Sequence, residues 1–317
     1  MTAGGRLGLS VPLDVPLREL PALARRAEEL GYTDAWSMES SALDGFTPLA
    51  AVAPVTERMR LGTAIIPAWT RPAGLLAMHA AALAELAPGR FVLGLGSSTP
   101  VVVEQWLGVP FSRPLSRTRE AALAVRALLA GERVGGMRLA RPPREQTVAI
   151  YVAALGPRML RMAGEVASGV VFYLVGPRLM PQLLADVGRE VDSVARLAVF
   201  AGEGAEARAA ARRSLLSYIL VPYYARSLTR QGFGEEVAAA GEAWRTGDRA
   251  GAAGQVSDAM LDELLLIGAP DRIADRLQAY RAAGLRTPVL AFASLGSDPG
   301  ARLAETSRLI ELLSALR

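Results

Sequence analysis

The chain has 317 residues, of which 51% are hydrophobic and 21% charged, and its formal net charge is +4. It has one histidine, His79, and no cysteine, lysine or asparagine. These absences exclude thiol catalysis, disulfides, cysteine-ligated clusters, lysine Schiff bases and multi-histidine metal sites. We therefore predict no metal site, and we expect any difficult chemistry to depend on a bound organic cofactor.

Charge and hydropathy patterns predict a soluble protein that acts on a small molecule. The arginines are interspersed with acidic residues and form no basic stripe interleaved with aromatics, as a nucleic-acid surface would require. No apolar run approaches the roughly 20 residues of a membrane helix, and the N-terminus lacks a signal-peptide pattern. We expect a cytoplasmic enzyme with a small-molecule substrate and with neither a nucleic-acid nor a membrane partner.

Eight short apolar segments alternate with helical patterns. Their composition and the turn residues after them predict buried strands at residues 6–11, 32–37, 60–67, 91–95, 148–153, 169–175, 195–200 and 288–293. Strands that alternate with helices through short loops favour parallel pairing. The sequence therefore predicts one domain over residues 1–317, a (β/α)8 TIM barrel with a helical insertion at about residues 205–266. A doubly wound sheet is the alternative.

The predicted strand at residues 91–95 has no polar face and leads into a turn of glycine, serine and threonine residues. At the C-terminal end of a barrel strand such a turn lies on the catalytic face. Gly94 and Gly96 also resemble part of a dinucleotide fingerprint, although Thr99 stands where its third glycine belongs. Alternatively, the two glycines serve only close packing.

The predicted strand at residues 148–153 is followed by small residues, by Gly156 and Pro157, and then by Arg158. Free backbone N–H groups at the start of the next helix suit an anion, and the arginine adds positive charge. An ordinary turn with proline in the first helical turn is the alternative.

Glu39 follows the predicted strand at residues 32–37, where a carboxylate can act as a general acid or as a hydrogen-bond partner. A solvated loop glutamate is the alternative. We interpret His79 as structural, because it lies within a predicted helix among alanines. Several aromatic residues could line a ring-shaped ligand or simply pack in the core: Trp36, Trp69, Trp106, Tyr173, Tyr223 and Tyr224.

Five stretches together resemble the bacterial-luciferase-like superfamily, and in particular its coenzyme F420-dependent oxidoreductases. In the family's order and spacing, they are residues 27–32, 60–65, 89–96 with the serines that follow, 151–158 and 266–270. The resemblance covers nearly the whole chain and implies a (β/α)8 barrel with inserted helices. It leaves the substrate open, because Ser10 stands where methylenetetrahydromethanopterin reductases of the family carry a glutamate.

The resemblance also implies a cofactor site along the strand ends. A non-prolyl cis peptide bond between Ala64 and Ile65 would bulge against the cofactor ring, and the turn at residues 154–156 would hold its phosphate. Glu39 falls where relatives place a catalytic acid or base. The cofactor-binding positions implied are Ala64, Ile65, Gly96, Ser97, Ser98, Ala154, Leu155, Gly156 and Tyr173.

The function implied is hydride transfer between reduced coenzyme F420 and a small organic substrate such as an imine or an enone. Two alternatives stay open: an FMN-dependent luciferase-like monooxygenase, and a flavin-binding relative that has lost catalysis. Barrels of this family often pair through helices near the second and third units. We therefore also expect a homodimer.

Overall fold

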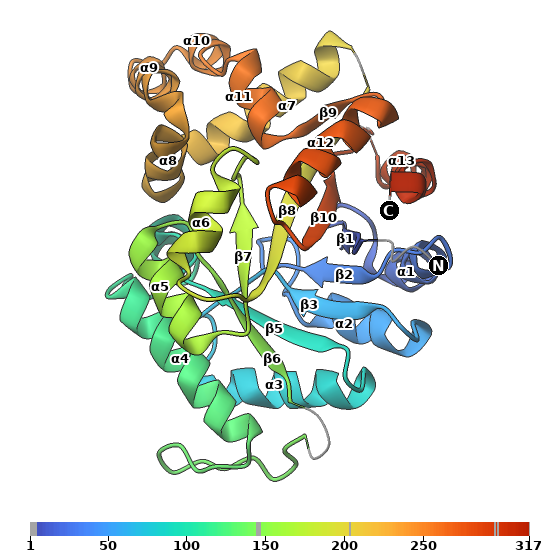
Figure 1. Ribbon diagram of the computed structural model, residues 1–317, viewed down its shortest axis with the longest axis vertical. Helices are drawn as coiled ribbons and strands as arrows, with labels where there is room; N and C mark the ends of the chain where they lie inside the picture. Colours follow the sequence, from blue (N-terminus) through green and yellow to red (C-terminus); the bar gives the residue numbers. More distant parts are fainter. Residues whose placement is uncertain (1–4, 144–146, 203, 295, 297, 317) are drawn as a thin grey trace.

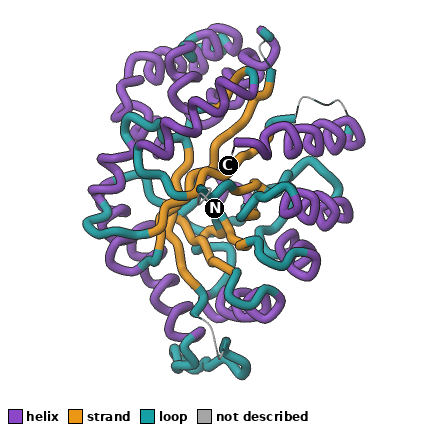
Figure 2. Tube along the Cα trace, turned by 45° about the vertical axis from the view of Figure 1, so that its right-hand side comes forward, coloured by secondary structure: helices purple, strands orange, loops and turns teal. Residues whose placement is uncertain are grey.

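The computed structural model describes residues 5–143, 147–202, 204–294, 296 and 298–316 (Figure 1). Its core is a sheet whose strands lie at the centre of the molecule, with helices around them (Figure 2). The strands are β1 (Gly8–Ser10), β2 (Asp34–Ser37), β3 (Arg60–Thr63), β4 (Ile66–Pro67), β5 (Phe91–Gly96), β6 (Ala149–Ala153), β7 (Gly169–Tyr173), β8 (Asp192–Ala201), β9 (Leu266–Gly268) and β10 (Thr287–Phe292).

The sheet closes into a barrel of eight parallel strands. In sequence order β1, β2, β3, β5, β6, β7 and β8 pair as neighbours, and β10 pairs with both β8 and β1 to complete the ring. The short β4 continues the third strand and pairs with β5, while β9 extends the far end of β8. The predicted (β/α)8 TIM barrel is confirmed, and the doubly wound alternative is wrong because the sheet has no open edge in the ring.

Most strand ends lie within two residues of the prediction, and there are three larger differences. The third predicted strand is two pieces, β3 and β4, separated by the peptide bond between Ala64 and Ile65. The seventh, β8, begins at Asp192 and not at residue 195, because its first two residues, Asp192 and Ser193, are polar and lie outside the apolar run. Strand β9 was not predicted, since three residues are too few to show a pattern.

Helices follow the strands around the outside of the barrel. They include α1 (Leu20–Glu29), α2 (Thr47–Val52), α3 (Ala73–Leu86), α4 (Pro114–Leu129), α5 (Pro157–Val166), α6 (Met180–Asp186), α12 (Pro270–Ala282) and α13 (Pro299–Leu313). A π-helix, η3 (Val101–Trp106), lies between β5 and α4. Among the described residues, no helix has both the length and the apolar character needed to cross a membrane.

The segment predicted as a helical insertion forms five α-helices and a π-helix, and it has its own small core. They are α7 (Ala205–Ile219), α8 (Pro222–Leu228), η4 (Thr229–Phe233), α9 (Gly234–Arg245), α10 (Arg249–Gly254) and α11 (Asp258–Leu264). Leu215, Leu216, Phe233 and Met260 pack there together with Phe200 from the end of β8. In Figure 1 the insertion lies at the top, beyond the ends of β7 and β8.

An apolar layer fills the middle of the barrel. It consists of inward-facing side chains from six strands: Trp36, Val92, Tyr151, Val171, Val194 and Val289. The largest of them, Trp36, fits only because Gly62 faces it from β3. A Cβ atom at position 62 would lie 2.3 Å from Cζ3 of the Trp36 ring. The barrel is therefore a packed core and not a pore, as is general for this fold.

A buried ionic network closes the N-terminal end of the barrel. Arg60 pairs with Asp34 and with Asp192, and it donates to the hydroxyl of Thr287 at 2.9 Å. Burial alone would lower the pKa of Arg60, but attraction to Asp34 and Asp192 outweighs it and raises that pKa. Burial likewise opposes ionisation of Asp192, yet bonds from Tyr151 and Arg60 lower its pKa. Arg6 also pairs with Asp34, at 3.1 Å, so two arginines balance two aspartates here, and small-molecule chemistry is left to the other end.

Candidate active site

The residues that the sequence singled out lie at the C-terminal end of the barrel. Because the strands are parallel, the turns after β2, β3, β5 and β6 and the end of β7 all open at this mouth. The topology thus brings together Glu39, the Ala64–Ile65 bond, residues 96–98, residues 154–156 and Tyr173. None of these roles is tested by a bound ligand, so the assignments of individual residues stay predictions.

The peptide bond between Ala64 and Ile65 is cis. It forms a bulge between β3 and β4, where Ala64 N–H donates to the Ser37 carbonyl at 2.6 Å and the Ile65 carbonyl accepts from Glu39 N–H at 3.2 Å. Both residues of the bond are half-buried. The bulge is therefore fixed to the strand end of β2 and borders the mouth.

The glycines of β5 make room for this bulge. A Cβ atom at Gly94 would lie 1.8 Å from the Thr63 carbonyl oxygen, and one at Gly96 would lie 2.8 Å from Cδ1 of Ile65. Close packing therefore explains why both positions are glycine, which was the alternative to a dinucleotide fingerprint. Whether Gly96 also contacts a cofactor stays a prediction.

Glu39 is held by an arginine that the sequence analysis missed. Arg71 Nη1 donates to both carboxylate oxygens, at 2.8 and 2.6 Å, and the Gly45 N–H lies 3.4 Å from one of them. The two side chains are only 14% and 15% exposed. The alternative of a solvated loop glutamate is wrong. Since both oxygens already accept hydrogen bonds, the present geometry suits Glu39 as an acceptor better than as a proton donor.

Arg71 is itself positioned by its neighbours. Its guanidinium lies 5.0 Å from the centre of the Phe46 ring, and Asp44 lies 3.9 Å from it. The Phe46 ring also stacks on the His79 ring, with 4.5 Å between the two ring centres, and Nδ1 of His79 lies 2.7 Å from the Leu75 carbonyl oxygen. These contacts confirm a structural role for His79. Arg71 lies in the loop between β4 and α3. A charged residue that follows a barrel strand is a candidate site residue, and this pattern could have identified Arg71 from the sequence.

The turn after β6 combines a helix start with positive charge. Gly156 precedes α5, and a Cβ atom there would meet nothing within 4 Å. Arg158 is exposed in the first turn of α5, and Arg230 of the insertion donates to the Leu155 carbonyl. Ala154 is buried at the base of the turn. The open side of the turn and its two arginines suit an anion; Arg230 was missed because it is 75 residues away from Leu155.

Tyr173 belongs to a group of three mutually packed tyrosines. Its ring centre lies 5.1 Å from that of Tyr218 and 6.1 Å from that of Tyr224. Burial raises the pKa of Tyr173 well above its ordinary value, so its phenol stays protonated at neutral pH. Arg196 lies over the same ring at 5.1 Å. The other predicted aromatics do not gather here: Trp36 fills the barrel, Trp69 stacks on Phe111 and Trp106 is exposed on η3.

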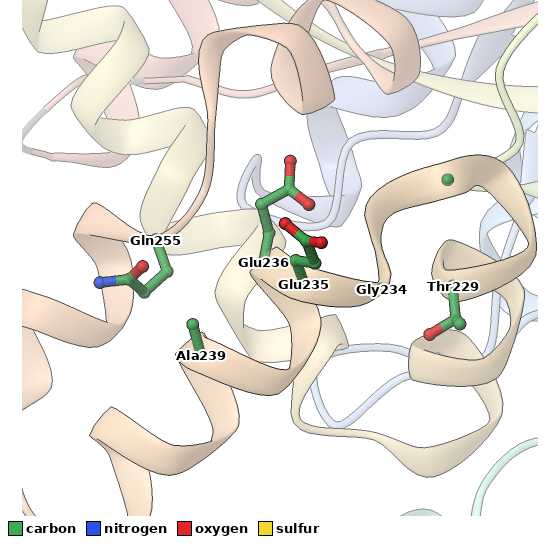
Figure 3. A pocket seen from close by; sticks show the side chains of 7 residues that line it. Thr229, Gly234, Glu235, Glu236, Ala239 and Gln255 are labelled. Atoms are coloured by element: carbon green, nitrogen blue, oxygen red, sulfur yellow. The ribbon is translucent and has the colours of Figure 1, made fainter.

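Two surface depressions lie in the insertion, away from the mouth residues. One, of about 740 Å3, is lined by Glu235 and Glu236 together with Thr229, Gly232, Gly234, Ala239 and Gln255 (Figure 3). The other, of about 410 Å3, is lined by residues of α7 and α10. The first has two carboxylates and no basic lining residue, which does not suit an anionic cofactor. Within the described parts of the chain, no group of three His, Cys, Asp or Glu residues could hold a metal.

Comparison with known proteins places the chain among the luciferase-like enzymes. The family model described as luciferase-like monooxygenase matches residues 2–287. The chain belongs to this family. The resemblance inferred from the sequence is thereby confirmed.

Relatives of this luciferase-like protein match along nearly its whole length. A 5,10-methylenetetrahydromethanopterin reductase of Methanolobus tindarius is 31% identical over 91% of this chain and 94% of its own. A Mycobacterium tuberculosis protein that carries the name "putative coenzyme F420-dependent oxidoreductase" is 29% identical over 92% of this chain and 96% of its own. The coenzyme F420-dependent tetrahydromethanopterin reductase of Methanopyrus kandleri has the same fold, with a TM-score of 0.75, 21% identity and 98% coverage of both chains.

Proposed function

We propose that this protein is a coenzyme F420-dependent oxidoreductase that transfers a hydride between the reduced deazaflavin and a small organic substrate such as an imine or an enone. The observation that carries the proposal is one mouth that combines Glu39, held by Arg71, with a cationic, open turn after β6. The name of the Mycobacterium tuberculosis relative favours F420 as the cofactor. When bound, F420 would supply the hydride-transferring carbon, which no side chain of this protein can supply.

The residues present fit such a cofactor. Residues 154–156 and the first N–H groups of α5 would bind its phosphate, with Arg158 adding charge. The open space beside Gly156 leaves room for the phosphate oxygens. The bulge at Ala64 and Ile65 would support the ring, and Ser97 and Ser98 would border it.

Glu39 is the proposed acid–base residue, held in place by Arg71. With both oxygens bound by one guanidinium, its carboxylate can accept a proton from substrate or from an intervening water, and Arg71 fixes its direction. Packing of the mouth against the insertion would exclude water from the reacting atoms.

Binding of the two candidate cofactors tests the proposal. Purified protein is titrated with F420 and, separately, with FMN, and the two affinities are compared. We expect F420 to bind far more tightly, and Arg158→Gln to weaken it by about 2- to 5-fold, since an exposed ion pair contributes little. Arg126→Gln, an exposed arginine on α4, is the matched control and should leave F420 binding unchanged. FMN binding without F420 binding would overturn the proposal.

The second candidate is an FMN-dependent monooxygenase, which the description of the matching family model favours. Tight FMN binding with oxygen consumption in the presence of a flavin reductant would support it. Cofactor binding with no turnover under any reductant would instead indicate a flavin-binding relative without catalysis.

We also propose that the protein acts as a homodimer. Helix α3 exposes three large apolar side chains, Leu75 at 40%, Met78 at 52% and Leu86 at 47%. The spacing of these residues places them on one side of the helix, and exposed apolar side chains grouped in this way are typical of subunit interfaces. Light scattering on the purified protein would measure its mass directly.

A further inference from the structure

Arg196 of β8 points into the barrel mouth. Alternate residues of a strand face opposite sides, and Val194, two positions earlier, belongs to the apolar layer that fills the barrel. Its neighbours Ala195 and Leu197 instead pack in the outer core beneath the helices. Further along the strand Phe200 joins the core of the insertion. Arg196 therefore lies between the apolar filling of the barrel and the insertion that covers its mouth.

The contacts of Arg196 leave half of its guanidinium free. Nε donates to the hydroxyl of Ser10 on β1 at 3.2 Å, and the planar group lies 5.1 Å from the centre of the Tyr173 ring. These two contacts fix its direction. The residues that the structure describes offer Nη1 and Nη2 no hydrogen-bond partner and Arg196 no carboxylate within 4.0 Å.

Two arginines at the ends of the barrel are, by contrast, neutralised by carboxylates. Arg60 pairs with Asp34 and Asp192 at the closed end, and Arg71 pairs with Glu39 at the rim. The tyrosines beside Arg196 bring no negative charge, because burial raises the pKa of Tyr173 and of Tyr224. A half-buried cation that is anchored at one edge and lacks a counter-ion is suited to binding an anion.

We propose that Arg196 binds a carboxylate of the substrate through Nη1 and Nη2, so that the enzyme acts on substrates that carry an acidic group. This inference rests on the proposed function. The cofactor phosphate is assigned elsewhere, to the turn after β6 with Arg158 and Arg230. Arg196 lies on β8 and reaches β1, a different arc of the barrel mouth from β6. Since Nε donates to Ser10, Nη1 and Nη2 of Arg196 are left to donate one hydrogen bond to each oxygen of a carboxylate.

A matched pair of ligands tests the charge requirement. trans-4-Oxo-2-pentenoate is an enone with a carboxylate, and its methyl ester is the same enone without the charge. Binding of each is measured by isothermal titration to the protein with and without F420. Because a hydrogen bond to a charged group is stronger than one between neutral groups, we expect the acid to bind about 10- to 100-fold more tightly than the ester.

Three variants locate the effect. Arg196→Gln should abolish the preference for the acid. Arg196→Lys keeps the positive charge but lacks the paired N–H donors of a guanidinium, so it should retain part of the preference. Arg126→Gln on the outside of α4 should behave as the wild type. Should Arg196→Gln fail to fold, the reduced ratio in Arg196→Lys carries the test.

The outcomes separate this inference from the proposed cofactor. A wild-type protein without preference for the acid, or an Arg196→Gln variant that keeps the preference, would overturn the role of Arg196. Equal weakening of acid and ester would also overturn it, since that indicates a structural role. If F420 fails to bind while the preference for the acid still depends on Arg196, the anion site stands and the proposed oxidoreductase function fails.

Discussion

Substitution of Gly94 by alanine tests the close approach of β5 to the bulge at residues 64–65. The added Cβ atom would lie 1.8 Å from the Thr63 carbonyl oxygen, which belongs to the backbone of β3 and cannot rotate away. Overpacking of a well-packed core costs typically 1–3 kcal/mol, and we expect Gly94→Ala at the upper end, about 3 kcal/mol. With roughly 2–4 °C of Tm per kcal/mol for chains of 150–250 residues, the melting temperature should fall by about 6–12 °C.

Two further glycines complete the series. At Gly96 the added atom would meet the side chain of Ile65 at 2.8 Å, which can shift, so Gly96→Ala should cost about 1 kcal/mol. Gly241 lies within α9 with nothing near its Cβ position, so Gly241→Ala should stabilise by about 0.5–1 kcal/mol. Thermal melting by circular dichroism measures all three. A Gly94→Ala variant that melts with the wild type, or above Gly96→Ala, would refute the reasoning.

Three other predictions concern catalysis, pH and assembly. Glu39→Gln should lower turnover by about 10²-fold with unchanged F420 affinity, whereas Glu85→Gln on α3 should leave both unchanged; equal turnover in the two variants would remove Glu39 from the chemistry. Because the folded state lowers the pKa of Asp192, its ionised form stabilises the fold at neutral pH, and this contribution is lost as the pH falls through that lowered pKa. The Tm difference between wild type and Asp192→Asn should therefore shrink from pH 7 to about pH 3, and a constant difference would contradict it. Met78→Arg should convert a dimer to a monomer in light scattering, and an unchanged mass would place the interface elsewhere.

The sequence predicted the barrel because each of its eight strands is a short apolar run followed by a turn. It also predicted which turns meet, since parallel strands place all their C-terminal ends at one mouth. The cis bond at Ala64 and Ile65 was expected only from the resemblance to a family, as nothing in the two residue types demands it.

The residues that contact the predicted site residues could not be predicted from the sequence. Arg71 lies 32 residues away from Glu39, and Arg230 lies 75 residues away from Leu155, so no local pattern joins them. The inward direction of Arg196 follows from the pleat of β8, but its strand was predicted to begin three residues too late, and the contact with Ser10 on β1 needs the closed barrel. Long-range pairing of this kind depends on tertiary packing.

The most direct test of the account is a crystal structure of the protein with F420 bound. We expect the ring to lie against Ala64 and Ile65, and the phosphate to lie within hydrogen-bond distance of backbone N–H groups in the turn at residues 154–156. A phosphate bound elsewhere, such as at the depression beside Glu235 and Glu236, or a ring on another arc of the mouth, would contradict it.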